Sequence, residues 1–179
     1  MPPNLSRAVA LAHLVGDLCQ FRRGPEDMPY SPALLVLLVA ASIVLDVATG
    51  ALFGGGDVLA RSLVSTALVL ALSWAALEVR KLGNRYVQTA SAIVACGLAF
   101  SLLALPLGWL AHPIPAAATA LTPMQVLLGW AVLALFVWNL AVFAHIVRRA
   151  IESSFGLAFA IVAAWAVADW ALGHVLFDA

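Results

Sequence analysis

Two acidic residues, Asp46 and Asp169, lie inside long apolar stretches of the sequence, at residues 31–56 and 154–177. A carboxylate in hydrocarbon is costly, so such a residue is by default either part of a functional site or a device that holds helices together. Two carboxylates that lie close together cannot both ionise cheaply, so they would share a proton. The chemistry predicted for this pair is therefore the binding of a proton or a cation within a membrane.

Other polar residues are expected at the same depth as the two carboxylates, because a helix rises about 1.5 Å per residue. The candidate ion or proton site consists of Asp46, Asp169, Arg61, Ser65 and Ser101. Two structural interpretations stay open beside it: Asp46 pairs with Arg61, or each Asp is neutral and hydrogen-bonded to a hydroxyl. Both would join the first, second and fifth membrane helices, and the paired site requires the first and fifth to be neighbours.

The composition explains why these residues would be inside a membrane. The chain has 179 residues, of which 64% are hydrophobic and only 10% charged, and its mean hydropathy is +1.04. Soluble domains average about half apolar and about a quarter charged residues, so the class is a polytopic membrane protein. The net charge is zero, and a nucleic acid is therefore not expected as a partner.

The predicted fold is all-α, with five transmembrane helices at about 33–53, 58–79, 86–110, 123–147 and 155–177. Each stretch has about 20 residues or more, enough to cross about 30 Å of hydrocarbon. Ser31, Asp57, Asn84 and Thr122 are candidate N-caps for the first four. Gly50 begins a Gly-x-x-x-Gly pattern at the end of the first span, which we interpret as a flexible turn rather than a helix-pairing motif.

The N-terminal part, residues 1–30, is predicted to be a separate cytoplasmic unit, and residues 31–179 the transmembrane domain. Residues 4–21 have apolar side chains at three-to-four spacing, which indicates an amphipathic helix at the membrane interface. The alternative is a helix packed on the end of the bundle. A linker rich in Pro and Gly then leads to the first span.

The two cysteines are expected to lie apart, Cys19 in a cytoplasmic segment and Cys96 in the middle of the membrane. Neither suits a disulfide or a zinc site. The histidines lack a ligand-like spacing, and no phosphate loop or catalytic motif is present. We therefore predict no metal, no cofactor and no catalytic residue, and the chain is more plausibly not an enzyme.

The basic residues predict the orientation. Eight of the nine Lys and Arg residues fall at the N-terminal segment, the second connection and the fourth connection, and only Arg61 falls on the other side. The positive-inside rule then places the N-terminus in the cytoplasm and the C-terminus outside. Frequent Ala, Leu and Arg over Lys suggest a GC-rich bacterium, so the expected location is the bacterial inner membrane, with the C-terminus in the periplasm.

A second group of polar residues is expected at the cytoplasmic ends of the helices. It suits the head group of an anionic lipid, or a partner, because basic residues between helix ends favour that role. The alternative is an ordinary belt of charges, in which Glu78 pairs with a nearby arginine. The group consists of Glu78, Arg80, Arg85, Gln88, Asn139, His145, Arg148 and Arg149.

Three short stretches carry a family resemblance: residues 24–32 (GPEDMPYSP), 85–92 (RYVQTASA) and 138–146 (WNLAVFAHI). With five spans in a chain of this length, they resemble the Yip (Ypt-interacting protein) superfamily, in particular its small bacterial members. The Asp-Leu-Tyr-Gly-Pro and Gly-Tyr-Ser motifs of the eukaryotic family are absent, so binding of small GTPases is not carried over. The resemblance implies a non-enzymatic protein that shapes membranes or scaffolds partners.

Two functions follow as hypotheses. The first is a membrane-organising or scaffold subunit that associates with the lipid bilayer, with itself as a homo-oligomer, or with a larger membrane complex. The second is a small proton- or cation-coupled transporter or channel that uses Asp46 and Asp169.

Overall fold

The computed structural model describes residues 3–53, 56–111 and 122–177, and within them all regular secondary structure is helical. The elements are α1 (Pro3–Cys19), η1 (Pro25–Asp27), α2 (Pro32–Phe53), α3 (Val58–Val79), η2 (Gly83–Arg85), α4 (Tyr86–Ala111), α5 (Pro123–Ala150) and α6 (Phe155–Phe177). Five of these helices, α2 to α6, are long and apolar enough to cross a membrane. The predicted fold class is therefore confirmed, and the chain is a polytopic membrane protein.

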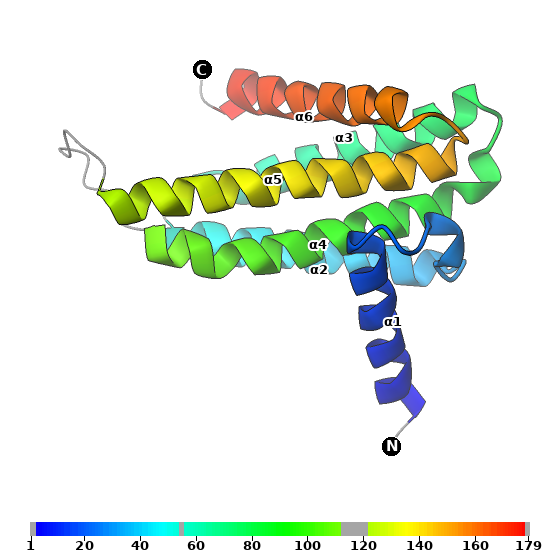
Figure 1. Cartoon of the computed structure of the whole chain (residues 1–179), viewed down its shortest axis with the longest axis horizontal. Helices are drawn as coiled ribbons and strands as arrows, with labels where there is room; N and C mark the ends of the chain where they lie inside the picture. Colours follow the sequence, from blue (N-terminus) through cyan, green and yellow to red (C-terminus); the bar gives the residue numbers. More distant parts are fainter. Residues whose placement is uncertain (1–2, 54–55, 112–121, 178–179) are drawn as a thin grey trace.

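Helix α4 lies at the centre of the bundle, since it contacts α1, α2, α3 and α5. The five long helices lie side by side along the long axis of the molecule, whereas α1 projects away from them (Figure 1). The connections from α3 to α4 and from α5 to α6 lie at one end of the bundle, which we call the basic end. It carries Arg80, Lys81, Arg85, Arg148 and Arg149.

Local capping signals fix several helix starts. The Thr122 hydroxyl accepts a hydrogen bond of 3.3 Å from the Gln125 amide, and the Thr122 amide donates one of 2.9 Å to the Gln125 side chain. Ser31 caps α2 through the Leu34 amide. Asp57 precedes α3 as predicted, but its side chain makes no capping hydrogen bond. Asn84 lies inside η2 rather than at a cap.

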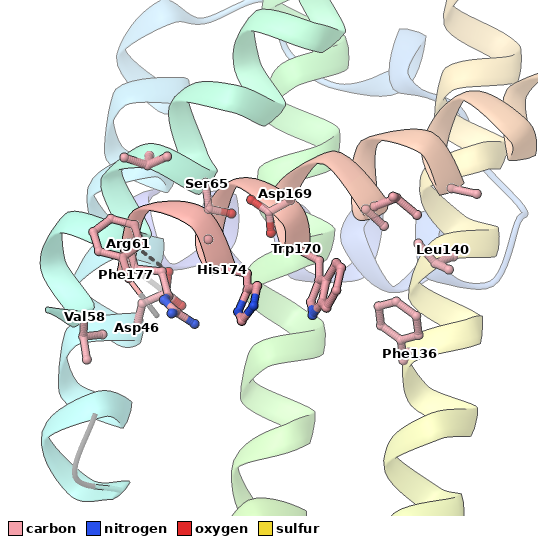
Figure 2. A pocket seen from close by; sticks show the side chains of 16 residues that line it. Asp46, Val58, Arg61, Ser65, Phe136, Leu140, Asp169, Trp170, His174 and Phe177 are labelled. Atoms are coloured by element: carbon pink, nitrogen blue, oxygen red, sulfur yellow. Dashed lines mark hydrogen bonds between the residues drawn. The ribbon is translucent and has the colours of Figure 1, made fainter. Parts of the chain in front are cut away.

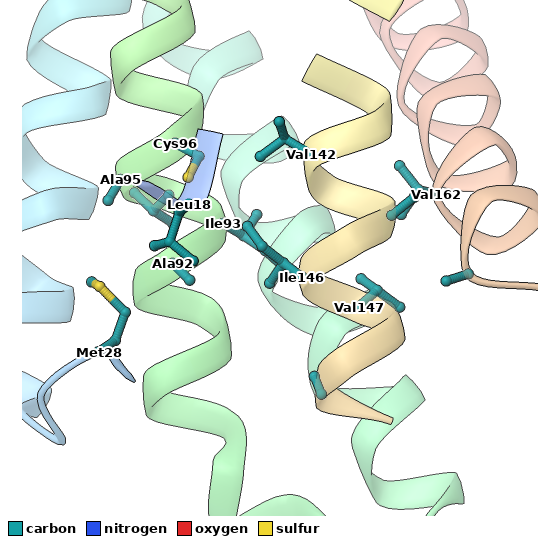
Figure 3. Close-up of a cluster of buried hydrophobic side chains, with 14 of the residues drawn as sticks. Leu18, Met28, Ala92, Ile93, Ala95, Cys96, Val142, Ile146, Val147 and Val162 are labelled. Carbon is teal, nitrogen blue, oxygen red and sulfur yellow. The ribbon is translucent and has the colours of Figure 1, made fainter. Parts of the chain in front are cut away.

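The best-buried part of the core lies toward the basic end, between α4 and α5 (Figure 3). The N-terminal segment contributes to it directly, because Leu18 and Met28 are 0% and 1% exposed. Helix α1 ends at Cys19, and Phe21, at a positive φ of 63°, turns the chain back toward the bundle. The C-terminal half of α1 is therefore packed on the bundle, which is one of the two arrangements expected for the N-terminal helix.

Gly50 lies in the last turn of α2. Gly54, the other glycine of the pattern, lies outside the described residues, so the interpretation of the pattern as a turn stays a prediction. A Cβ atom at this position would collide with the Val58 side chain at the start of α3. The absence of a side chain at Gly50 therefore allows the ends of α2 and α3 to approach each other.

Candidate functional site

A cavity of about 770 Å³ lies between α2, α3, α5 and α6, toward the end of the bundle opposite the basic end. Both Asp46 and Asp169 line it, together with Arg61 and Ser65 (Figure 2). Four of the five residues of the candidate ion site therefore share one cavity, although they come from three different helices. Its volume is in the range of pockets that hold drug-sized molecules, about 300–1,000 Å³.

The hydrogen-bond partner of Asp46 is a serine. The Ser62 hydroxyl of α3 donates a hydrogen bond of 2.6 Å to the Asp46 carboxylate of α2, and Ser62 is only 5% exposed. Among the described residues no ion pair joins Asp46 to Arg61. Of the two structural interpretations, the one in which a hydroxyl group binds the carboxylate therefore applies to Asp46.

The helices of the two carboxylates are not packed extensively on each other, which corrects the prediction that they are neighbours. Helix α3 contacts both α2 and α6 and separates them. Asp46 and Asp169 still meet at one cavity, because α3 presents the small side chains of Ser62 and Ser65 between them. Within the described part of the chain, Asp169 has no hydrogen-bond or ion-pair partner, so a polar partner at this level is found only for Asp46.

Aromatic side chains form much of the remaining wall. The rings of Trp170 and His174 stack with centroids 5.8 Å apart and an interplanar angle of 7°. The Arg61 guanidinium lies 5.5 Å from the centroid of the Phe177 ring. A cation–π contact of this kind keeps a positive group at the cavity wall.

A second cavity, of about 400 Å³, lies between α2, α3, α4 and α5. It contains the fifth candidate, Ser101, and also Ser42, Thr66 and Asn139. Asn139, expected in the group of polar residues at the helix ends, lines this cavity instead. As a polar residue well inside a span it is expected to face the bundle, and it does.

The two cavities meet at Asp46, which lines both of them together with Ser65 and Phe136. A carboxylate at this position can exchange a proton or a cation with groups on either side. Asp46 is therefore the central residue of the candidate site.

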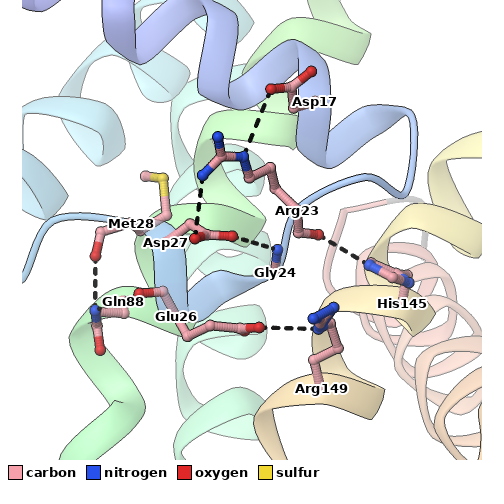
Figure 4. A network of polar contacts seen from close by, with 9 residues as sticks. All are labelled: Asp17, Arg23, Gly24, Glu26, Asp27, Met28, Gln88, His145 and Arg149. Atoms are coloured by element: carbon pink, nitrogen blue, oxygen red, sulfur yellow. Dashed lines mark hydrogen bonds and ion pairs between the residues drawn. The ribbon is translucent and has the colours of Figure 1, made fainter.

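Three residues of the cluster predicted at the basic end, Gln88, His145 and Arg149, belong to a network of charge pairs and hydrogen bonds with the N-terminal segment (Figure 4). Arg149 pairs with Glu26 at 3.0 Å, and Arg85 pairs with Glu152 at 2.8 Å. Glu78, expected to pair with a nearby arginine, forms no ion pair within the described residues. The prediction was wrong because Glu26 and Glu152, from the N-terminal segment and the α5–α6 connection, are closer to Arg149 and Arg85.

Other members of that group form hydrogen bonds with backbone carbonyl groups rather than ion pairs with charged side chains. The Gln88 amide donates to the Met28 carbonyl at 2.7 Å, and Arg80 donates to the Ile151 carbonyl at 3.2 Å. His145 is hydrogen-bonded to the Arg23 carbonyl at 3.0 Å. The side chain of Arg148, which is half-buried on α5, has no hydrogen bond or ion pair to another described residue.

A third cavity, of about 320 Å³, lies within this network. It is lined by Glu26, Arg85, Arg149 and Glu152, so two negative groups balance two positive ones. The salt bridges that cross it are solvent-exposed pairs, which contribute about 0–1 kcal/mol each to stability.

The contact of the two cysteines was missed by the sequence reading. The Cys96 thiol on α4 lies close enough to Cys19, at the end of α1, for the two thiols to interact. This contact holds the pKa of Cys19 below its usual value, against the opposing effect of burial. The expectation that the two residues lie apart is therefore wrong, because α1 ends beside α4 rather than beyond the end of the bundle.

The backbone at Cys19 is also anchored to α5. The Trp138 indole N–H donates a hydrogen bond of 3.0 Å to the Cys19 carbonyl. Trp138 in turn packs edge-on against Phe100, with ring centroids 5.2 Å apart, and Phe100 lines the second cavity. The end of α1 is thus connected to a cavity wall through two aromatic rings.

Comparison with known proteins gives no relative from which a function could be inferred. No protein-family model, no curated protein and no solved structure matches the chain.

Proposed function

We propose that the protein is a small transporter or channel in which Asp46 and Asp169 bind a proton or a cation. The observation that supports this most is that two intramembrane carboxylates, on helices separated by α3, line one cavity. Structural carboxylates need only a local partner, whereas Asp169 lines the cavity without a partner among the described residues. A cavity that brings two acidic side chains together in a membrane favours a positively charged ligand.

The size and walls of the cavity favour an organic cation over a bare ion. A volume of about 770 Å³ is far larger than a metal ion needs. Phe136 and Trp170 line the same space, and aromatic faces attract cations when water is excluded. A compact lipophilic cation would then contact both the rings and the carboxylates.

Protons and cations would compete for this site. A carboxyl group that carries a proton is neutral and no longer attracts a cation. A cation that binds to the carboxylate would therefore displace a proton held there. Because Asp46 also lines the second cavity, the released proton has a polar route toward Ser101 and Asn139.

The test is the binding of tetraphenylphosphonium to the purified protein, with proton release measured in weakly buffered solution. We expect saturable binding with release of protons, and loss of both in Asp46→Asn and Asp169→Asn. Asp57→Asn, an exposed acid at the start of α3, is the matched control and should behave like the wild type. Absence of binding by the wild type, or unchanged binding and proton release by both folded variants, would exclude a cation site at these carboxylates.

Transport itself is tested in proteoliposomes. A proton gradient should drive accumulation of the same cation by the wild type and by Asp57→Asn, but not by Asp46→Asn. If the wild type binds the cation but moves neither the cation nor protons, the protein is a binding protein rather than a transporter.

A second candidate function, membrane organisation or scaffolding, rests on α1. The part of α1 beyond the bundle has exposed apolar residues, among them Val9 at 48% exposure, and Figure 1 shows the helix projecting away from the other five. This arrangement would suit a surface for lipid or a second copy, in keeping with the proposed likeness to the Yip superfamily. Substitution Val9→Glu should weaken self-association measured by native mass spectrometry, whereas His13→Glu, also exposed, should not. Equal behaviour of the two variants argues against this function.

The orientation proposed with either function places the basic end in the cytoplasm of a bacterial cell. It is supported by the concentration of Lys and Arg at that end. Balanced charges in the third cavity would suit the head group of a zwitterionic lipid as well as an anionic one. Reporter fusions to the C-terminus should be active only when the reporter functions in the periplasm.

A further inference from the structure

We propose that Cys19 and Cys96 are a site of reversible disulfide formation that locks α1 onto α4. They are the only two cysteines of the 179-residue chain. One ends α1, the other lies within α4, and α2 and α3 separate them in the sequence. Their side chains are nevertheless close neighbours, because Leu18, next to Cys19, packs beside Cys96 in the core (Figure 3).

The packing around the pair holds both backbones in position. Leu18, the residue before Cys19, is completely buried and lies beside Ala92 and Cys96 in the core (Figure 3). On the other side, Trp138 donates its hydrogen bond to the Cys19 carbonyl. Because both elements are fixed by contacts other than the thiols, the two sulfur atoms stay close in the reduced protein.

The two thiols have different access, which suits an ordered exchange. Cys19 is partly exposed, whereas Cys96 is 0% exposed. An oxidant that is itself a low-molecular-weight disulfide would therefore react first with the Cys19 thiolate. Its sulfur–sulfur bond breaks, one thiol leaves, and Cys19 carries a mixed disulfide. Cys96 then attacks the Cys19 sulfur, loses its proton, and displaces the second thiol.

Formation of the bond would restrict the N-terminal segment. In the reduced protein, the end of α1 is held by non-covalent contacts that break together when the segment opens. In the oxidised protein, Cys19 cannot leave α4, even when the chain is cut in the exposed stretch at Arg22 and Arg23. The reducing environment expected of a cytoplasm keeps the two cysteines in the thiol form. The disulfide would therefore form only when conditions become oxidising.

The test is reaction of the detergent-purified, full-length protein with 2,2′-dipyridyl disulfide. We expect the wild type to release two thiones for each molecule of reagent consumed, and to lose the mass of two hydrogen atoms without dimerising. Cys96→Ser should instead release one thione and gain one pyridylthio group on Cys19. Two pyridylthio groups on the wild type, a disulfide between chains, or no reaction would each overturn the proposal.

A second measurement shows whether the bond fixes α1. After trypsin treatment, the N-terminal fragment should remain attached to a larger fragment on non-reducing gels of the oxidised wild type. It should be released after reduction, and also from the Cys19→Ser variant under either condition. Release from the oxidised wild type would mean that the bond does not join α1 to the bundle.

Discussion

The Ser62 hydroxyl and the Asp46 carboxylate form a hydrogen bond of 2.6 Å between α3 and α2. The contact joins two neighbouring helices at the level of the cavity of about 770 Å³, which both residues line. A hydrogen bond to an ionised carboxylate is shorter and stronger than one between neutral groups. Ser62 therefore orients the side chain of Asp46, which lines both cavities.

Substitution Ser62→Ala should destabilise the protein by about 0.5–1.5 kcal/mol, since it removes the hydrogen bond and leaves Asp46 without its partner. The measurement is thermal unfolding of the protein in detergent. Ser73→Ala is a matched control, because Ser73 is equally buried but bonds only to the Leu70 carbonyl of its own helix. Equal losses of stability in the two variants would show that the bond between the helices contributes nothing.

Gly50→Ala should lower stability by about 1–3 kcal/mol, because the added methyl group overpacks the contact between α2 and α3. The new Cβ would lie 2.6 Å from Val58 Cγ1, and a β-branched side chain has few alternative rotamers. Gly129→Ala, with no heavy atom within 4 Å of the new Cβ, should be neutral or stabilise its helix by up to about 1 kcal/mol. Chemical denaturation of both variants measures the difference, and a destabilised Gly129→Ala with an unaffected Gly50→Ala would contradict the packing.

Trp138→Phe should loosen the end of α1. The phenyl ring keeps the contact with Phe100 but cannot donate to the Cys19 carbonyl, so about 1 kcal/mol is lost locally. Amide hydrogen exchange at residues 18–23 should then be roughly fivefold faster. Trp130→Phe, at an exposed position of the same helix, should leave this exchange unchanged; a similar increase there would indicate general loosening of α5.

Cys96→Ala should shift the pH profile of Cys19 alkylation to higher pH. In the wild type, the interaction with Cys96 lowers the pKa of Cys19, whereas burial raises it. Removal of the thiol leaves only the effect of burial, so the thiolate fraction falls at any given pH and alkylation slows. The rate of reaction with iodoacetamide between neutral and alkaline pH measures the shift. An unmoved profile, or one moved to lower pH, would mean that Cys96 does not stabilise the thiolate.

The membrane helices were predictable because their signals are local. About twenty successive apolar residues indicate a membrane span. Its start is indicated by capping residues next to it, such as Ser31 or the Thr122–Gln125 pair. The depth of Asp46 and Asp169 followed from counting along these spans. Their meeting at one cavity was anticipated for the wrong reason, since α3 separates the two helices.

The arrangement around the bundle axis was not predictable in the same way. Antiparallel helices can be ordered in several ways that leave every residue at the same depth, so the place of α3 between α2 and α6 could not be read from spacing. The contact of Cys19 with Cys96 likewise joins segments separated by two whole helices. Pairing at that distance leaves no periodic pattern, although two lone cysteines in an apolar chain could have drawn attention to it.

The docking of the N-terminal segment has a consequence for biosynthesis. Residues at its end contact α5 through bonds that span 119 and 122 positions of the chain, from Cys19 to Trp138 and from Arg23 to His145. A ribosome makes this segment before α5, because α5 follows it in the chain. The segment can therefore dock only after α5 has emerged, and until then the side chains that it buries against the bundle lack their final partners. Docking of the N-terminal segment is thus coupled to a late step in the assembly of the bundle.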